Sequence, residues 1–282
     1  MTLSLTAFQG RAGDRNDLGI PGALSLASAL AHRLALPLAI VGSPQPALNT
    51  DWKTELAAAA PDLRKLADHV AAQLLAGSFP VTVLNRCAAA IATIPRIVDH
   101  CPDVCVVWFD AHADLNTPTS SASGYLGGLA LSASVGLWDS GFGGNLPLAN
   151  IVLVGSRDLD PFEAELVASG KVWLIAPNTP NLADAVVLAI ANRPVYVHLD
   201  CDVLEPGLVP TDFCVDGGLS LQSLHTVFSA LSTTNVIGWE IAEFQDAWGP
   251  GLESASPTGL IDAIQPLLTS FHTRRPRQAV SQ

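Results

Sequence analysis

Basic residues are scarce in this chain of 282 residues, which has only 14 Lys and Arg against 26 Asp and Glu. The net charge of −12 excludes the basic surface that nucleic-acid-binding proteins present, so we expect no nucleic-acid partner. Long apolar runs are missing too, because no stretch of about 18 residues is free of charges and turn-forming residues. The first residues also lack the basic start and apolar core of a secretory signal. We therefore expect neither a membrane span nor export.

Cysteines are few and odd in number, with five in the whole chain. An odd count in a long chain favours reduced thiols over a disulfide framework, which indicates a cytoplasmic protein. Charged residues make up 14% of the chain and hydrophobic residues 49%, so a large core can form and general disorder is excluded. The composition leaves the oligomeric state open.

Short apolar runs that read as strands alternate with Ala- and Leu-rich segments of helical period. The predicted strands lie at about 3–8, 36–42, 80–85, 104–110, 150–156, 171–177, 194–202 and 236–244. The predicted helices include 20–35, 51–76, 87–99, 126–136, 219–231 and 255–272. This alternation predicts an α/β domain of three layers, with helices on both faces of one parallel sheet. No linker divides the chain, so we expect one domain over residues 1–274 and a polar tail at 275–282.

The unusual polar residues follow the predicted strands. They are Asp110, His112 and Asp114 after one strand, Asp200 and Asp202 after another, Arg157, Asp158, Asp160 and Glu163 after a third, and Glu240 and Glu243 at the end of the last. Ligands of open parallel sheets bind outside the carboxyl ends of the strands. Carboxylates gathered there repel one another and are costly to desolvate unless cations neutralise them.

The spacing of these residues favours a metal site. Alternate residues of an extended segment share one side, so the members of D-x-H-x-D and D-x-D can converge. Four carboxylates and one imidazole suit Mn²⁺ or a similar divalent ion better than a structural zinc. Two such segments make a two-metal site plausible, in which a bridging water is ionised near neutral pH. Either motif alone could be a solvated loop, but together in a charge-poor chain they favour the metal site.

Four separate stretches resemble the arginase–agmatinase (ureohydrolase) family. These are "FDAHADLNTP", "HLDCDVLEPG", "VGSRDLDPFE" and "GWEIAEF", which occur in the family's order between about residues 80 and 245. The resemblance implies a single α/β domain with an eight-stranded parallel sheet. It also implies hydrolysis of a guanidino C–N bond with the help of two Mn²⁺ ions, so the expected partner is a small guanidino amino acid.

The resemblance also implies roles for individual residues. Asp110, Asp114 and Asp200 would bind the first metal, and Asp110, His112, Asp200 and Asp202 the second. Asp114 and Glu243 would be catalytic, with Asp114 on the nucleophilic water and Glu243 facing the guanidinium. Asn116 and Ser123 would hold the α-carboxylate of the substrate and Asp160 its α-amino group, and Glu163 lies in the same substrate-binding stretch.

Cys87 and Arg86 mark the first departure from the family pattern, because they stand where the family has a histidine ligand of the first metal and an aspartate. A thiolate could replace that ligand, since a nearby divalent cation lowers the pKa of a thiol. It is softer than imidazole and adds a negative charge, so the site would lose some preference for Mn²⁺ and could accept Zn²⁺ or Fe²⁺. Alternatively, Cys87 is a small buried apolar residue and the first metal is weak or missing.

Gly127 marks the second departure, because it stands where the family has a proton-shuttling histidine. Losing a general acid costs about 10²–10⁴-fold in rate, so ordinary arginine should be a poor substrate. A less basic guanidine needs less help, and N-hydroxylation lowers guanidine basicity. Two smaller departures are His198 in place of a serine, at a position that is not a ligand, and Glu240 in place of an aspartate.

Cys87 is shared with a branch of the family that acts on N-hydroxy-L-arginine in antibiotic biosynthesis. The resemblance to that branch implies conversion of N-hydroxy-L-arginine to hydroxyurea and L-ornithine. Two alternatives stay open. One is an arginase or another ureohydrolase with a related guanidino substrate, and the other is a degenerate member that binds a guanidino ligand without turnover.

Overall fold

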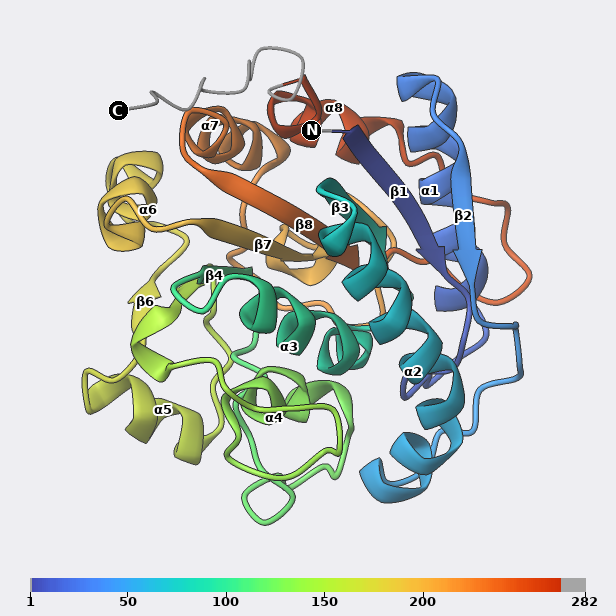
Figure 1. Cartoon of the computed structure of the whole chain (residues 1–282), viewed down its shortest axis with the longest axis horizontal. Helices are drawn as coiled ribbons and strands as arrows, with labels where there is room; N and C mark the ends of the chain where they lie inside the picture. The colour runs from blue at the N-terminus through green and yellow to red at the C-terminus, as the bar shows by residue number, and fades with distance from the viewer. Residues whose placement is uncertain (1, 270–282) are drawn as a thin grey trace.

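The computed structural model describes residues 2–269, so the predicted tail at 275–282 lies outside the described residues. The described part contains an eight-stranded, all-parallel sheet (Figure 1). Its strands are β1 (Thr2–Phe8), β2 (Leu38–Val41), β3 (Ser78–Val83), β4 (Cys105–Phe109), β5 (Ile151–Val154), β6 (Trp173–Ile175), β7 (Val195–Asp200) and β8 (Val236–Ala242). They lie side by side in the order β2-β1-β3-β8-β7-β4-β5-β6. The predicted fold class is confirmed.

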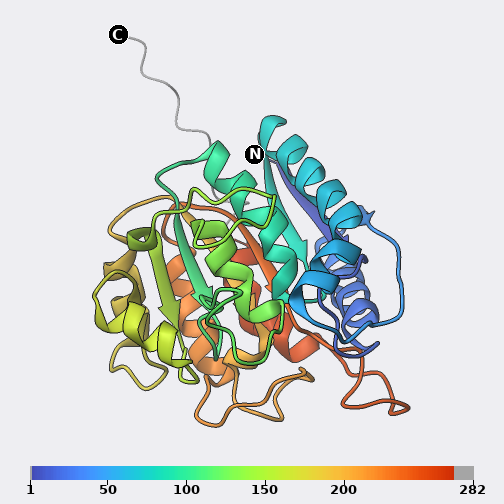
Figure 2. The same ribbon diagram turned by 90° about the horizontal axis from the view of Figure 1, so that it is seen from below.

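Helices cover both faces of this sheet. They are α1 (Gly19–Leu34), α2 (Trp52–Leu75), α3 (Ala90–His100), α4 (Ala130–Val135), α5 (Pro161–Ala168), α6 (Leu182–Ile190), α7 (Leu221–Leu231) and α8 (Thr258–Thr269). Helices α2, α3 and α4 lie in front of the sheet in Figure 1, and the turned view in Figure 2 shows helices flanking the strands. Buried residues of α1, α6, α7 and α8 form a separate core on the opposite face.

Strand β4 shows why this layering follows from the sequence. Its five residues are all buried, as expected for a strand covered on both faces. Cys105, Val107 and Phe109 belong to the core beneath α1, α7 and α8, whereas Val106 and Trp108 belong to the core beneath α2 and α3. Successive side chains of a strand point to opposite faces, so one apolar run supplies both cores.

The predicted helices are found with small changes at their ends. Helix α2 begins after Asp51, whose carboxylate accepts hydrogen bonds from the backbone N–H groups of Lys53 and Thr54. It continues through Pro61, because the buried face that carries Leu63, Leu66 and Val70 offsets one missing backbone hydrogen bond. The predicted helix at 126–136 is instead a 3₁₀ turn (Gly127–Leu129) followed by α4. Glycines at 127 and 128 disfavour a regular α-helical start.

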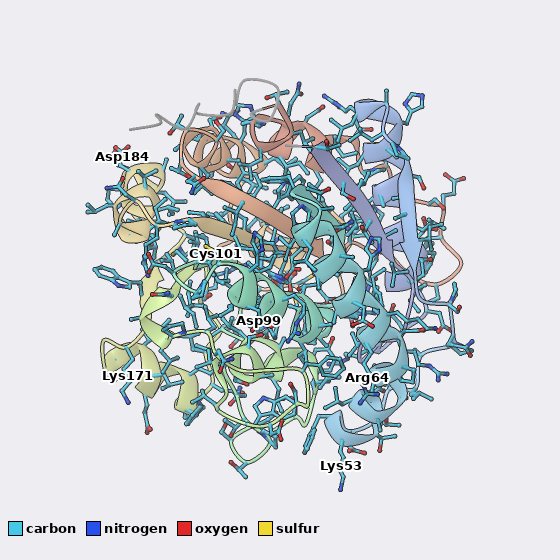
Figure 3. The ribbon with its side chains drawn as sticks, viewed as in Figure 1. Lys53, Arg64, Asp99, Cys101, Lys171 and Asp184 are labelled. Carbon is cyan, nitrogen blue, oxygen red and sulfur yellow. The ribbon has the colours of Figure 1, made fainter. Side chains whose placement is uncertain are left out.

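Exposed charged side chains such as Lys53, Lys171 and Asp184 project outward at the rim of the molecule in Figure 3. None of the helices over residues 2–269 is both long and apolar enough to cross a membrane.

Candidate functional site

The strand order brings the conspicuous polar motifs together. β3, β8, β7 and β4 are consecutive neighbours in the sheet, and their carboxyl ends lead into Cys87, Glu243, Asp200 and Asp110 respectively. A pocket with a volume of about 150 Å³ opens above these ends. Its walls are formed by Arg15, Cys87, His112, Asp114, Asn116, Ser121, Ser123, Tyr125, Gly127, Gly128, Asp158, Asp160, Glu163, Asp200, Asp202, Phe213 and Glu243. Most of the polar residues expected to converge therefore lie around one cavity, whereas Asp110, Arg157 and Glu240 do not line it.

His112 joins the acids that follow β4 and β7. Its Nδ1 lies 3.2 Å from Oδ1 of Asp110 and 3.0 Å from Oδ2 of Asp202. Possible ligand atoms of these three residues lie within 4.8 Å of one another. Burial and the neighbouring Asp202 carboxylate raise the pKa of Asp110 to about 7.

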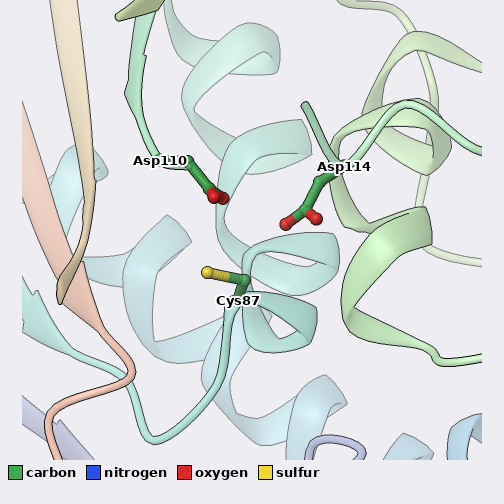
Figure 4. A group of neighbouring side chains, drawn as sticks. All are labelled: Cys87, Asp110 and Asp114. Atoms are coloured by element: carbon green, nitrogen blue, oxygen red, sulfur yellow. The ribbon is translucent and has the colours of Figure 1, made fainter. Parts of the chain in front are cut away.

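Cys87 belongs to two further groups of this kind, one with Asp110 and Asp114 and one with Asp200 and Glu243. Figure 4 shows the side chains of Cys87, Asp110 and Asp114 pointing toward one another. The thiol donates a hydrogen bond of 2.9 Å to Oδ2 of Asp200. Both groups place the Cys87 sulfur among buried carboxylates, within reach of an ion that they could hold.

This donor set fits divalent cations. Burial, and then the neighbouring carboxylates, raise the pKa values of Asp114 and Asp200 well above the ordinary value for aspartate. Such a shift means that the ionised forms repel one another in a site that water does not solvate. A cation at the centre of the cluster removes that repulsion, and carboxylate oxygens with one imidazole are donors that hard divalent ions prefer. Cys87 adds one soft donor to the set.

The other side of the pocket carries the residues expected to bind substrate. Asn116 donates a hydrogen bond of 2.7 Å from Nδ2 to Oδ2 of Asp160. Both oxygens of Glu163 accept backbone N–H groups, one from Leu115 and one from Asp160, in the capping box that begins α5. Ser123 is exposed at the mouth. Glu163 therefore supports the wall, while Asn116, Asp160 and Ser123 present polar groups to the cavity.

Two non-glycine residues at the site have left-handed backbone conformations, Asp114 with φ 52° and Glu243 with φ 66°. Such conformations are uncommon for these residue types and collect at functional sites, where the surrounding structure maintains them. Both residues are the expected catalytic ones.

Gly127 leaves no room for the side chain that the family pattern has there. A Cβ atom at this position would overlap the ring of Tyr125, which would have to move. The Tyr125 hydroxyl is buried without a hydrogen-bond partner among the described residues. Burial raises the pKa of Tyr125, and the nearby Glu243 carboxylate raises it further. An uncharged hydroxyl thus lies in the pocket beside the position of the missing imidazole.

Arg86 has a structural role that the sequence did not reveal. It is completely buried, and its guanidinium lies 2.8 Å from Oε2 of Glu243 and 3.3 Å from Oδ1 of Asp14. The backbone N–H of Cys87 donates to the other oxygen of Glu243, at 3.0 Å. Glu243 is therefore fixed from two sides. The sequence feature that could have indicated these ion pairs is an arginine directly after an apolar strand in a chain with few charged residues.

We expect Arg86→Met to lower the free energy of unfolding by about 3–5 kcal/mol, because it leaves Asp14 and Glu243 buried without their cation. Chemical denaturation measures this loss. The matched control is Arg33→Met, which removes an exposed ion pair of 2.7 Å with Asp262 and should cost no more than about 1 kcal/mol. Equal losses in the two variants would show that Arg86 contributes no more than a surface ion pair.

Comparisons with known proteins agree on one family. Residues 28–256 match the model of the arginase family. The chain is 39% identical over 272 residues to N(omega)-hydroxy-L-arginine amidinohydrolase of Streptomyces lavendulae, an alignment that covers 96% of this chain and 99% of that protein. It is 33% identical over 194 residues to an arginase of Eremothecium gossypii, covering 62% of this chain and 49% of that enzyme. The crystal structure of arginase from Bacillus subtilis superposes with a TM-score of 0.82 at 23% identity, covering 95% of this chain and 99% of the other.

Proposed function

This chain belongs to the arginase family of hydrolases, and from that premise we propose that it hydrolyses N-hydroxy-L-arginine to hydroxyurea and L-ornithine. One observation carries the choice of substrate: the pocket has Gly127 and an uncharged Tyr125 hydroxyl where an arginase needs a proton-donating histidine. Without that general acid, a substrate with a less basic guanidine is favoured. The 39% identity to an enzyme named for N-hydroxy-L-arginine supports the same choice.

We propose two Mn²⁺ ions as the cofactors. Cys87, Asp110, Asp114 and Asp200 would hold the first, and Asp110, His112, Asp200 and Asp202 the second. When bound, the ions supply a water that is ionised near neutral pH and neutralise the charge of the transition state. Support comes from the three compact groups of possible ligand atoms. Support also comes from Asp114 and Asp200, because burial disfavours their ionised forms unless a cation lies beside them.

The catalytic proton is assigned to Asp114. In our proposal its carboxylate accepts a proton from the nucleophilic water and returns it to the departing nitrogen of ornithine. In the same proposal Glu243 faces the guanidinium of the substrate, and Arg86 and the Cys87 backbone N–H hold its carboxylate in place. Fixed hydrogen-bonding groups of this kind favour the transition state, because they need no rearrangement as charge develops.

The amino-acid end of the substrate would lie at the pocket mouth. In our proposal Asn116 and Ser123 bind the α-carboxylate and Asp160 binds the α-amino group, with Glu163 holding the wall behind Asp160. The guanidinium of Arg15 lies 4.9 Å from the ring centre of Phe213 at the same mouth. A cation on one side and carboxylates on the other match a zwitterionic substrate better than a simple amine.

Tyr125 is assigned to the N-hydroxyl group of the substrate. Its buried hydroxyl has no partner among residues 2–269, and the neighbouring Glu243 would face the guanidino group. A hydroxyl left unpaired in the free protein can hydrogen-bond an N–OH group that arginine lacks. We further propose that the protein acts in the cytoplasm, since all five cysteines are free thiols.

Product analysis tests the proposed function. Protein loaded with Mn²⁺ should release hydroxyurea and ornithine from N-hydroxy-L-arginine, and much less urea from L-arginine at equal concentration. Protein stripped with a chelator should release neither product. Faster urea release would identify an arginase instead. Stoichiometric binding of either compound without any release would identify a guanidino-binding protein.

A further inference from the structure

Three departures from the family pattern are linked by contacts although they come from separate segments of the sequence: His198 contacts both Cys87 and Glu240. The pairing register of β7 and β8 places His198 opposite Glu240, and that of β4 and β7 places Trp108 opposite His198. Trp108, His198 and Glu240 therefore form one row across three neighbouring strands. Cys87 follows β3 and contacts this row through its sulfur, which lies 3.1 Å from Nε2 of His198.

Glu240 holds one edge of the His198 ring. Its Oε2 accepts hydrogen bonds from the hydroxyls of Tyr196, at 2.8 Å, and Thr93, at 2.6 Å. Its Oε1 lies 2.7 Å from Nδ1 of His198. Because both oxygens are engaged and Glu240 is completely buried, the carboxylate has no freedom to turn away from the ring.

Trp108 fixes the plane of the same ring. The indole and the imidazole are stacked, with ring centres 3.5 Å apart and planes at 4°. The indole N–H also donates a hydrogen bond of 2.8 Å to Oδ2 of Asp110. The imidazole therefore lies against a side chain that already orients one of the expected metal ligands.

We propose that His198 is a positioning residue that holds the sulfur of Cys87 at the first metal position. The inference rests on the metal assignment of the proposed function. A cysteine side chain is shorter than the histidine it replaces. Rotation about its Cα–Cβ bond moves the sulfur among three staggered positions, so a neighbour is needed to hold the sulfur in one of them. Second-shell partners of this kind orient metal ligands, and their loss costs about 10–100-fold in metal affinity.

The arrangement changes what a Cys87→His exchange should do. An imidazole at position 87 would extend into the place of the His198 ring, because the sulfur is already 3.1 Å from Nε2. Cys87→His alone should therefore weaken the first metal position. The double variant Cys87→His/His198→Ser frees that space and should regain metal binding. The two exchanges affect the same contact. The change in metal affinity of the double variant should therefore differ from the sum of the changes in the two single variants.

The same three residues could be read as the nucleophile, base and orienting acid of a metal-free cysteine hydrolase. The surroundings of the sulfur argue against this use. Cys87 is buried, and its sulfur lies 2.9 Å from the carboxylate of Asp200 and close to those of Asp110 and Asp114. Such neighbours attract a cation to the sulfur and oppose a free thiolate.

Metal binding, measured without substrate, tests the proposal. The wild type, His198→Ala and Glu240→Gln are titrated with Mn²⁺ by equilibrium dialysis and, separately, loaded with Co²⁺, whose absorption reports a thiolate ligand through a charge-transfer band. We expect both variants to bind one of two ions about 10–100-fold more weakly than the wild type and to lose most of that band. Tyr196→Phe is the control, because Thr93 still donates to the same oxygen of Glu240 at 2.6 Å and keeps the carboxylate in place, so both signals should be kept.

An unchanged affinity and band in His198→Ala would overturn the proposal, as would a Cys87→His variant that binds Mn²⁺ better than the double variant. If His198→Ala does not fold, Glu240→Gln and the double variant decide the question in the same way. Turnover by metal-free wild type would also overturn it, in favour of the cysteine nucleophile. A wild type that binds fewer than one ion would instead contradict the proposed function itself.

Discussion

Asp200→Asn is expected to abolish turnover, with a fall of at least about 10³-fold, because Asp200 is shared by both proposed metal positions. Without the ions, the pKa of the nucleophilic water returns from about 7 toward its much higher value in bulk water. The uncharged amide oxygen of asparagine is also a weaker acceptor than the Asp200 carboxylate for the hydrogen bond of 2.9 Å from the Cys87 thiol. Steady-state kinetics with N-hydroxy-L-arginine at saturating Mn²⁺ measures the loss.

Although Asp200→Asn should lose activity, it should gain stability in the absence of metal. Burial and the neighbouring Asp202 and Asp110 raise the pKa of Asp200 in the folded protein. The folded metal-free protein then binds more protons than the unfolded chain, so its stability falls as the pH rises above about 4, the ordinary pKa of an aspartate. Asp200→Asn removes one such carboxylate. Metal-free Asp200→Asn should therefore melt at a higher temperature than metal-free wild type at pH 8, and gain little when Mn²⁺ is added.

Glu205→Gln provides the control for Asp200→Asn. Glu205 is exposed outside the pocket and accepts a hydrogen bond of 2.7 Å from the backbone of Gly218, so its exchange should change neither the rate nor the effect of Mn²⁺. Full activity of Asp200→Asn would show that Asp200 is not a ligand of the proposed metal ions. A metal-free wild type more stable at pH 8 than at pH 5 would contradict the burial of repelling carboxylates.

Tyr125→Phe is expected to erase most of the preference for the hydroxylated substrate. Loss of a hydrogen bond that leaves a buried polar group unpaired costs about 1–3 kcal/mol, so kcat/KM for N-hydroxy-L-arginine should fall about 10–100-fold. L-Arginine has no N-hydroxyl group, and its slow turnover should change much less. The ratio of the two kcat/KM values is therefore the informative quantity.

Tyr196→Phe is the matched control for this substitution, since Tyr196 is the other tyrosine of the chain and its hydroxyl binds Glu240 outside the pocket. It should leave the ratio for the two substrates unchanged. Equal losses for both substrates in Tyr125→Phe would mean that the ring shapes the pocket without contacting the N-hydroxyl group.

The fold was predictable from the sequence because its signals are local. Each strand of a sheet covered on both faces is a short, continuous apolar run, and β4 and β7 are clear examples. The exception at 126–136 has the same physical basis, since two adjacent glycines weaken helix formation where the pattern of small residues suggested a helix. The strand order could not be derived from local patterns, and the family resemblance implied only an eight-stranded parallel sheet, without the order of its strands.

The candidate site was predictable where its residues are close in the sequence. Asp110, His112 and Asp114 lie within five positions, and the spacing alone indicates convergence. The contacts of His198 with Glu240 and of Arg86 with Asp14 could not be predicted, because they depend on strand register and on loops far apart along the chain. From the sequence alone His198 is only a minor departure from the family pattern, although in the structure it contacts the sulfur of Cys87.

The number of Mn²⁺ ions bound per chain tests the central claim most directly, that buried acids from adjacent strand ends form a two-metal centre. Wild-type protein dialysed against Mn²⁺ and analysed by elemental mass spectrometry should retain close to two ions per chain, and Asp200→Asn should retain fewer than one. Fewer than about one ion on the wild type, or the same number on both proteins, would contradict the account.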